Sequence, residues 1–153
     1  MVYYSEERKM IRKANINDLT VLTGLALELW PGSTTEEMRA DLQTVLSKED
    51  AAFFLLFVEG RAIGFAQVSL RYDYVEGTQT SPVGYLEGIY IEPNHRRRGL
   101  GRSLVTACEV WVRRKGCDEF ASDCELTNEE SLRFHLHTGF LEANRIICFA
   151  KKV

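Results

Sequence analysis

Residues 96–101 read Arg96-Arg97-Arg98-Gly99-Leu100-Gly101, and they lie between a strand pattern at 84–91 and a helix pattern at 99–115. The first four N–H groups of a helix lack partners inside the helix, and the helix dipole adds partial positive charge at the same end. The three arginines supply fixed positive charge and planar donors. The glycines at 99 and 101 are expected to let the backbone approach a ligand closely. We therefore expect this turn to bind a polyphosphate.

The segments around the turn predict an α/β protein. Strand patterns occupy 10–14, 52–58, 62–72, 84–91, 119–124 and 141–151, and helix patterns occupy 17–30, 35–46, 99–115 and 128–137. The first helix shows apolar residues at helical spacing, and Gly116 ends the third helix as a C′ residue. An antiparallel meander followed by alternating strands and helices predicts a mixed sheet, with the ligand turn after a central strand.

Composition restricts the class of protein. The 153 residues, 45% of them hydrophobic and 27% charged, suit one soluble globular domain over 1–153. No apolar run approaches the roughly 18 residues of a membrane span, and no signal-peptide pattern is present, so we expect a cytoplasmic protein. The net charge of −3 argues against a nucleic-acid partner and suits a cationic substrate. The four cysteines form no C-x-x-C pair, which favours reduced structural thiols.

The turn does not fit two common phosphate-binding motifs. It lacks the G-K-[ST] of a P-loop and the first glycine of G-x-G-x-x-G. Arg96-x-x-Gly99-x-Gly101 instead resembles the R/Q-x-x-G-x-G/A signature of the GNAT acetyltransferases. Asn128-x-x-Ser131 and Gly139-Phe140 resemble the last motif of that family. The resemblance implies acetyl-CoA as co-substrate and the GNAT fold, a mostly antiparallel central sheet splayed between two central strands and flanked by helices.

Longer segments resemble one branch of this family, the aminoglycoside 6′-N-acetyltransferases. They include Leu29-Trp30-Pro31-Gly32, Asp73-Tyr74-Val75-Glu76-Gly77, Leu86-Glu87-Gly88-Ile89 and Ala121-Ser122-Asp123, and the similarity covers nearly the whole chain from Met10. It implies direct acetyl transfer to a 6′-amine in a ternary complex, antibiotic resistance, and a homodimer that buries C-terminal strand surface. Two alternatives stay open: a GNAT enzyme for another small amine or a protein amine, and a CoA-binding module without activity.

The resemblance also implies where acetyl-CoA binds. Its pantetheine arm is expected to pair with a strand like an added β-strand, and its pyrophosphate is expected to lie on the basic turn. The expected cofactor-binding residues are Ile89, Tyr90, Ile91, Arg96, Arg97, Arg98, Gly99, Leu100, Gly101, Arg102 and Asn128. Core packing is a compatible role for the two isoleucines, and a solvated turn is the alternative for the arginines. Strand N–H groups also suit an oxyanion hole for the thioester carbonyl.

For the amine substrate, the resemblance implies a pocket that contains Trp30, Tyr74, Glu87 and Asp123. Asn144 stands where the relatives carry an acidic contact, so that contact is expected to be weaker. Carboxylates and flat aromatic faces suit a polycationic amino sugar. The alternatives are an anchor in the core for Trp30 and an ordinary loop aromatic for Tyr74.

Three residues are candidates for catalysis. Asp123 and Glu87 are each a lone carboxylate in an apolar strand pattern, and unpaired buried carboxylates are costly. We expect Asp123 to be the general base or amine-orienting residue, with Glu87 the rival or a relay; the alternative is a structural ion pair to an arginine. His135 replaces the usual family tyrosine and is a candidate acid for the CoA thiolate, although a thiol with a pKa of about 8.5 leaves tolerably without one. His135 and His137 diverge on the helix, and no metal motif occurs in the sequence.

Overall fold

The computed structural model describes residues 7–153, which fold around a five-stranded sheet in the order β1-β2-β3-β4-β5. Neighbouring strands are antiparallel except for β4 and β5, which are parallel. The strands are β1 (Lys9–Lys13), β2 (Ala51–Val58), β3 (Arg61–Arg71), β4 (Val83–Ile91) and β5 (Phe120–Ser122). The sheet is therefore mixed and mostly antiparallel, which confirms the predicted fold class.

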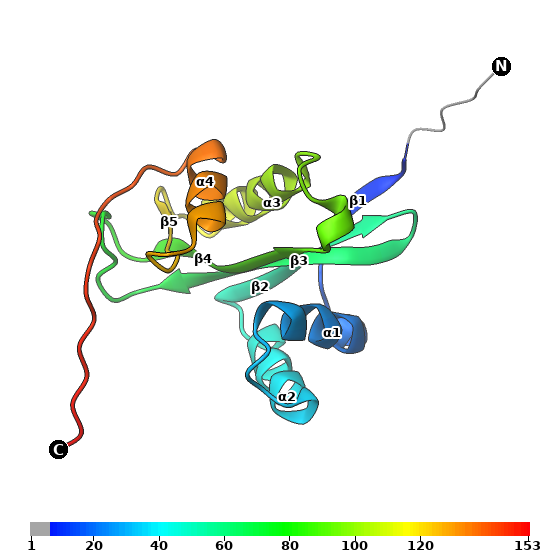
Figure 1. Ribbon diagram of the computed structural model, residues 1–153, viewed down its shortest axis with the longest axis horizontal. Coiled ribbons are helices and arrows are strands. Elements are labelled where there is room, and N and C mark those ends of the chain that lie inside the picture. The colour runs from blue at the N-terminus through cyan, green and yellow to red at the C-terminus, as the bar shows by residue number, and fades with distance from the viewer. Residues whose placement is uncertain (1–6) are drawn as a thin grey trace.

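Helices cover both faces of the sheet, with α1 and α2 on one face and α3 and α4 on the other (Figure 1). The helices are α1 (Leu19–Leu29), α2 (Thr35–Leu46), α3 (Leu100–Arg114) and α4 (Glu129–His137), with short 3₁₀ turns at Ile16–Asp18 and Pro93–His95. Thr34 and Glu37 form a capping box that starts α2. Each face has its own apolar core, with Phe53 and Phe65 under α1 and α2 and Leu104 and Cys108 on the α3 side.

A β-bulge in β4 sets which residues face which core. Gln67 pairs with Gly88 but the next residue, Val68, pairs with Leu86, so Glu87 is an extra residue in β4. Leu86 lies in the α3-side core, and Gly88, two residues later, lies against Trp30 of the other face. Without the bulge these two residues would share a face, because strand side chains alternate. The bulge therefore brings Gly88 beneath Trp30 on the α1–α2 face.

The sheet splits between β4 and β5. These strands pair at only three positions, ending with Leu86 and Ser122, whereas β4 continues to Ile91. Among residues 7–153, the last five residues of β4 have no strand partner on the side of β5. Unpaired N–H and C=O groups on such an edge can accept an extended ligand as an added strand. The predicted splay between the two central strands is confirmed.

The predicted strand at 141–151 is wrong for a single chain. The segment is extended, carries no strand assignment, and runs away from the sheet (red in Figure 1). Its apolar side chains are exposed: Leu141 is 90% exposed, Ile147 79% and Phe149 91%. Residue preference gives a segment strand character, but a strand forms only where a neighbour supplies backbone hydrogen bonds. This segment meets no such neighbour among the described residues.

Two further observations concern the cysteines and the membrane. The cysteines are free; Cys108 and Cys117 are buried and Cys148 is exposed. Burial raises the pKa of the Cys108 thiol to about 12 and also raises that of Cys117, so neither is a ready nucleophile. No helix within residues 7–153 combines the length and the apolar character that crossing a bilayer requires.

Candidate functional site

The turn before α3 has the geometry of an anion site. Arg97 (φ 64°) and Gly99 (φ 75°) are both left-handed, and Gly99 is the N-cap of α3. In the part of the chain that the structure describes, no side chain caps this helix, so its first N–H groups point to solvent. The Leu100 side chain is buried, which leaves its backbone as its only possible contact with a ligand. A left-handed non-glycine residue costs about 1–2 kcal/mol, and such strain is typical of functional turns.

Gly101 has a structural reason that differs from the expected one. A Cβ at this position would lie 2.6 Å from Cε2 of Phe134 on α4. The absence of a side chain therefore lets α3 and α4 approach each other. The structure provides this reason in place of the close phosphate approach that the sequence suggested for Gly101.

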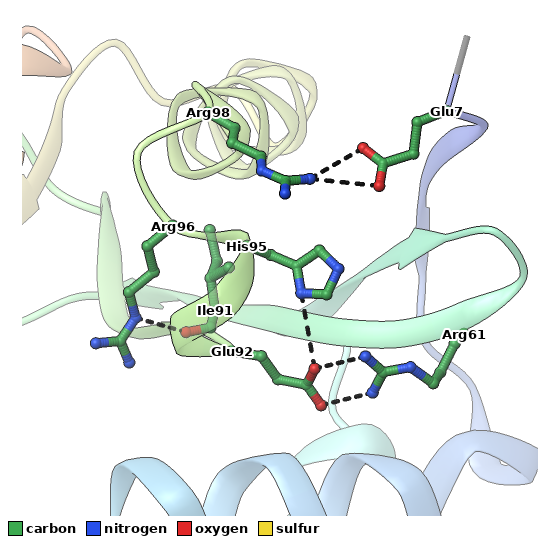
Figure 2. A network of polar contacts seen from close by, with 7 residues as sticks. All are labelled: Glu7, Arg61, Ile91, Glu92, His95, Arg96 and Arg98. Atoms are coloured by element: carbon green, nitrogen blue, oxygen red, sulfur yellow. Dashed lines mark hydrogen bonds and ion pairs between the residues drawn. The ribbon is translucent and has the colours of Figure 1, made fainter. Parts of the chain in front are cut away.

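The arginines of the turn already have partners in the protein (Figure 2). The Arg96 Nε donates to the Ile91 carbonyl at 2.7 Å, and Arg98 forms an ion pair with Glu7 at 3.2 Å. Arg102 donates to the carbonyl of His137 and so ties α3 to α4. These pairs are exposed and therefore weak, so an incoming phosphate can displace them at small cost.

The end of β4 is held by an ion pair that sequence reasoning missed. Both terminal nitrogens of Arg61 donate to the Glu92 carboxylate at 2.8 Å (Figure 2). This hydrogen-bonded pair lowers the pKa of Glu92. The three residues before Glu92 divide between the cores, with Tyr90 toward α1 and α2 and Ile89 and Ile91 toward α3. The two isoleucines thus serve the core, while their backbone lies on the open edge.

Asn128, the other expected cofactor residue, is the N-cap of α4. Its side-chain oxygen accepts a hydrogen bond from the Ser131 N–H at 3.0 Å. Satisfying this N–H stabilises the start of the helix. The amide NH₂ of Asn128 is a further donor on the same side of the sheet as the turn before α3.

Glu87 is paired rather than lone. Its carboxylate accepts hydrogen bonds from Ser69 Oγ at 2.6 Å and from Arg71 at 2.8 and 3.0 Å. The ion pair to an arginine, considered from the sequence as the alternative, is therefore what the structure shows. A carboxylate with a bidentate guanidinium partner is held in place, which suits electrostatic positioning better than proton abstraction.

Asp123 belongs to the same network through Tyr85. The Arg71 guanidinium lies 3.4 Å from the centre of the Tyr85 ring, and the Tyr85 hydroxyl donates to Asp123. Burial and then this hydrogen bond raise the pKa of Tyr85, so the phenol stays a donor at neutral pH. Asp123 is exposed and lies one residue past the end of β5, not inside a strand as expected. The two candidate carboxylates therefore lie in one connected cluster at the split of the sheet.

Sequence reasoning missed Arg71 and Tyr85, although a signal was present. Ser69 and Arg71 are polar residues at alternate positions of an otherwise apolar strand. Ser69 pairs with Tyr85 in the neighbouring strand. Alternate polar residues on one strand share a face, so they mark a polar site next to Glu87.

Trp30 lies over β4 beside this cluster. A Cβ on Gly88 would come within 2.5 Å of the indole Cζ2, and the indole meets Phe65 edge to face at 5.8 Å. Trp30 is half-buried, so it anchors the end of α1 and also presents a flat surface next to the split. Both roles considered for Trp30 are compatible with this position.

Tyr74 and Asn144 form a second group, on the 73–82 loop and the C-terminal segment. Tyr74 is 78% exposed, and its hydroxyl lies 3.5 Å from Glu76. The Asn144 amide donates to the same Glu76 carboxylate at 3.0 Å. A Cβ on Gly77 would strike Ala143, so the loop and the segment are in close contact. This group lies on different elements from the Asp123 cluster.

His135 on α4 reaches the split from the other face. Its Nε2 lies 2.8 Å from Ser122 Oγ, and its Nδ1 lies 2.7 Å from the carbonyl oxygen of Ser131. The Ser122 hydroxyl is also 3.2 Å from the Leu86 carbonyl. No group of three or more His, Cys, Asp or Glu side chains within residues 7–153 is placed to hold a metal ion.

Comparison with known proteins agrees with this geometry. The model of the acetyltransferase (GNAT) family matches residues 19–140. A helix N-terminus beside a split between β4 and β5 is thus the cofactor end of an acetyltransferase fold, and the chain belongs to the GNAT family.

Similar proteins within the family share one description. The chain is 40% identical over 142 residues to aminoglycoside N(6′)-acetyltransferase type 1 of Salmonella typhimurium strain LT2, covering 93% of this chain and 98% of the relative. It also resembles solved structures of aminoglycoside N-acetyltransferase AAC(6′)-Iy. In complex with CoA, that enzyme matches with a TM-score of 0.95 at 38% identity, covering 99% of this chain and 100% of the other. In complex with the bisubstrate analogue CoA-S-monomethyl-acetylneamine, it matches with a TM-score of 0.92 at 39% identity, covering 95% and 99%.

Proposed function

We propose that this protein is an aminoglycoside 6′-N-acetyltransferase, which transfers the acetyl group of acetyl-CoA to the 6′-amine and so confers resistance. The observation that carries the proposal is a split sheet with opposite charge at its two ends. An uncapped helix N-terminus with arginines lies at one end, and Glu87 and Asp123 lie at the other. The similarity to the Salmonella typhimurium enzyme over 93% of the chain supports it.

The open edge of β4 is the proposed place for the pantetheine arm. Paired as an added strand along 89–91, the arm would bring its thioester to the end of the β4–β5 pairing. The pyrophosphate would then lie on the N–H groups of the turn before α3. A free N–H of β4 next to the thioester would polarise its carbonyl and stabilise the developing oxyanion.

The chemistry needs no covalent enzyme intermediate. The neutral 6′-amine attacks the thioester carbon, the new C–N bond forms, and the nitrogen loses a proton to Asp123. The C–S bond then breaks and CoA leaves as the thiolate. Holding both reactants in line supplies much of the rate enhancement, since alignment alone is worth about 7–11 kcal/mol in model reactions.

Turnover with a panel of amines tests the proposal. CoA release is measured with kanamycin, tobramycin, spermidine and a peptide amine. We expect turnover with the two aminoglycosides at a kcat/KM well above that of the other two amines. Preference for spermidine or the peptide would indicate the other acetyltransferase function, and CoA binding without any turnover would indicate a binding module.

We also propose a cytoplasmic homodimer that uses the C-terminal segment. In one chain the apolar side chains of 141–153 are exposed, and β5 is an edge strand of only three residues. Exposed apolar residues in an extended segment and an unpaired strand edge are complementary surfaces. The segment of a second copy is therefore the proposed partner, and it would carry Asn144 into the assembly.

A further inference from the structure

Ser122 and His135 form a hydroxyl–imidazole pair that the mechanism above does not use. The Ser122 Oγ and His135 Nε2 are 2.8 Å apart, which is a good hydrogen-bond distance. The ring packs edge to face against Phe134 and Phe140, with centroids 5.6 and 5.3 Å away. The pair is half-buried, and its imidazole is held by aromatic contacts on both sides.

The neighbours of His135 fix which ring nitrogen can exchange a proton. The Nδ1 lies 2.7 Å from the backbone carbonyl of Ser131, and a carbonyl oxygen only accepts hydrogen bonds. Nδ1 must therefore carry a hydrogen in both charge states of the ring. Only Nε2 is free to gain or lose a proton, and the group in front of Nε2 is the Ser122 hydroxyl. His135 can thus reach the split of the sheet only through Ser122.

Ser122 lies at the point where β4 and β5 separate. Leu86 and Ser122 are the last pair of the β4–β5 ladder, and Asp123 follows immediately. Side chains alternate along a strand, so the two residues face opposite sides. Ser122 turns to His135 of α4, and Asp123 turns to Tyr85 beside the Arg71–Glu87 pair. A thioester at this point would therefore have Asp123 on one face of the sheet and Ser122 on the other.

We propose that Ser122 and His135 are a proton relay that protonates the CoA thiolate as it leaves; this inference rests on the proposed acetyl transfer. In the active form the imidazolium Nε2–H donates to Ser122 Oγ. As the C–S bond breaks, the sulfur takes the Ser122 hydroxyl proton and Oγ takes the Nε2 proton. The serine is unchanged, the imidazole is left neutral with its hydrogen on Nδ1, and solvent returns one proton. Asp123 and the relay thus handle the amine proton and the thiolate proton on separate faces.

Single-turnover kinetics with two acetyl donors test the relay. Ser122→Ala is expected to slow acetyl transfer from acetyl-CoA about 10- to 100-fold, the low end for general acid catalysis because a thiolate is a fair leaving group. With acetyl-selenoCoA, whose selenolate needs less protonation, we expect a loss below about threefold. Ser122→Thr, which keeps the hydroxyl, is expected to retain most of the rate.

The same experiment separates the relay from a structural role. Ser122→Ala and His135→Ala together are expected to cost no more than either alone, because both break one chain of proton transfer. Ser47→Ala removes another serine hydroxyl that donates to a backbone carbonyl and is the matched control. An equal loss with both donors, or a full rate for Ser122→Ala with acetyl-CoA, would overturn the relay. A wild-type protein inactive with every amine would instead refute the acetyl transfer itself.

Discussion

Glu87 and Asp123 are both carboxylates at the amine end of the site, but their partners differ. Glu87 accepts two hydrogen bonds from the Arg71 guanidinium and one from Ser69. Asp123 accepts one from the neutral phenol of Tyr85 and is exposed. A carboxylate without a guanidinium partner is freer to accept a proton, so the geometry favours Asp123 as the base.

The first prediction separates these two carboxylates. Asp123→Asn is expected to lower kcat about 100-fold, the usual size for loss of a general base, with acetyl-CoA affinity unchanged. Glu87→Gln is expected to act mainly on the KM for the aminoglycoside, since it leaves the Arg71 charge uncompensated beside a cationic substrate. Steady-state kinetics and CoA titration measure both effects, with Asp118→Asn as the control. A large loss of kcat in Glu87→Gln but not in Asp123→Asn would reverse the assignment.

The second prediction concerns the titration of Tyr85. Its pKa is raised in the folded protein, whereas an unfolded tyrosine titrates near pH 10. Tyr85 therefore contributes stability that is complete below about pH 10 and is lost as pH rises toward its folded pKa. The free energy of unfolding is expected to fall less steeply above pH 10 in Tyr85→Phe than in the wild type.

Alkaline difference spectroscopy checks the same point directly. Tyrosinate absorbance counts ionised residues among the six tyrosines of the chain. Tyr85 and Tyr90 both have raised pKa values, so they are expected to ionise last in the folded protein. Tyr85→Phe is expected to remove one of these late groups. Loss of an early-titrating group in this variant would contradict the buried hydrogen bond to Asp123.

At the scale of elements, the two glycines of the turn have different roles, which gives the third prediction. Gly101→Ala is expected to destabilise the protein by about 1–3 kcal/mol, because the new Cβ collides with Phe134. Adding Phe134→Leu is expected to restore part of this loss. Gly99→Ala meets open space but a left-handed φ, so a cost of about 1–2 kcal/mol without such rescue is expected. Urea denaturation measures all three variants, and a Gly101→Ala as stable as wild type would contradict the packing role.

The elements show how far a sequence can predict this structure. Hydrophobic periodicity and capping residues located the four helices and five of the six expected strands to within a few residues. The 141–151 segment failed because strand formation depends on a partner, which a single sequence does not reveal. At the site, residue types indicated Asp123 and the basic turn, but the Arg71 ion pair and the bulge at Glu87 depend on strand register.

At the scale of the whole molecule, the fourth prediction concerns assembly. Sedimentation is expected to show a dimer, and Ile147→Asp or Phe149→Asp is expected to shift it to monomer, because a buried charge on an apolar interface is costly. Val110→Asp on α3 changes a partly exposed apolar residue away from the segment and is the control. A monomeric wild-type protein, or dimers unaffected by both changes, would contradict the proposed interface.

The molecule thus joins two binding sites through one split sheet. The turn before α3 accounts for a phosphate-bearing donor and gives no information about the acceptor. The cluster of Arg71, Tyr85, Glu87 and Asp123 accounts for a cationic amine on the opposite face. The central claim is that this amine is the 6′-amine of an aminoglycoside.

Two aminoglycosides that differ at a single position test this claim most directly. Neomycin carries an amine at the 6′ position, where paromomycin carries a hydroxyl group. Initial rates of CoA release with saturating acetyl-CoA compare the two, and mass spectrometry and NMR locate the acetyl group. We expect turnover of neomycin with one acetyl group on the 6′-nitrogen, and paromomycin slower by at least about 100-fold because an attacking amine is absent there. Equal rates for the two compounds, or acetylation of neomycin at another nitrogen, would contradict the account.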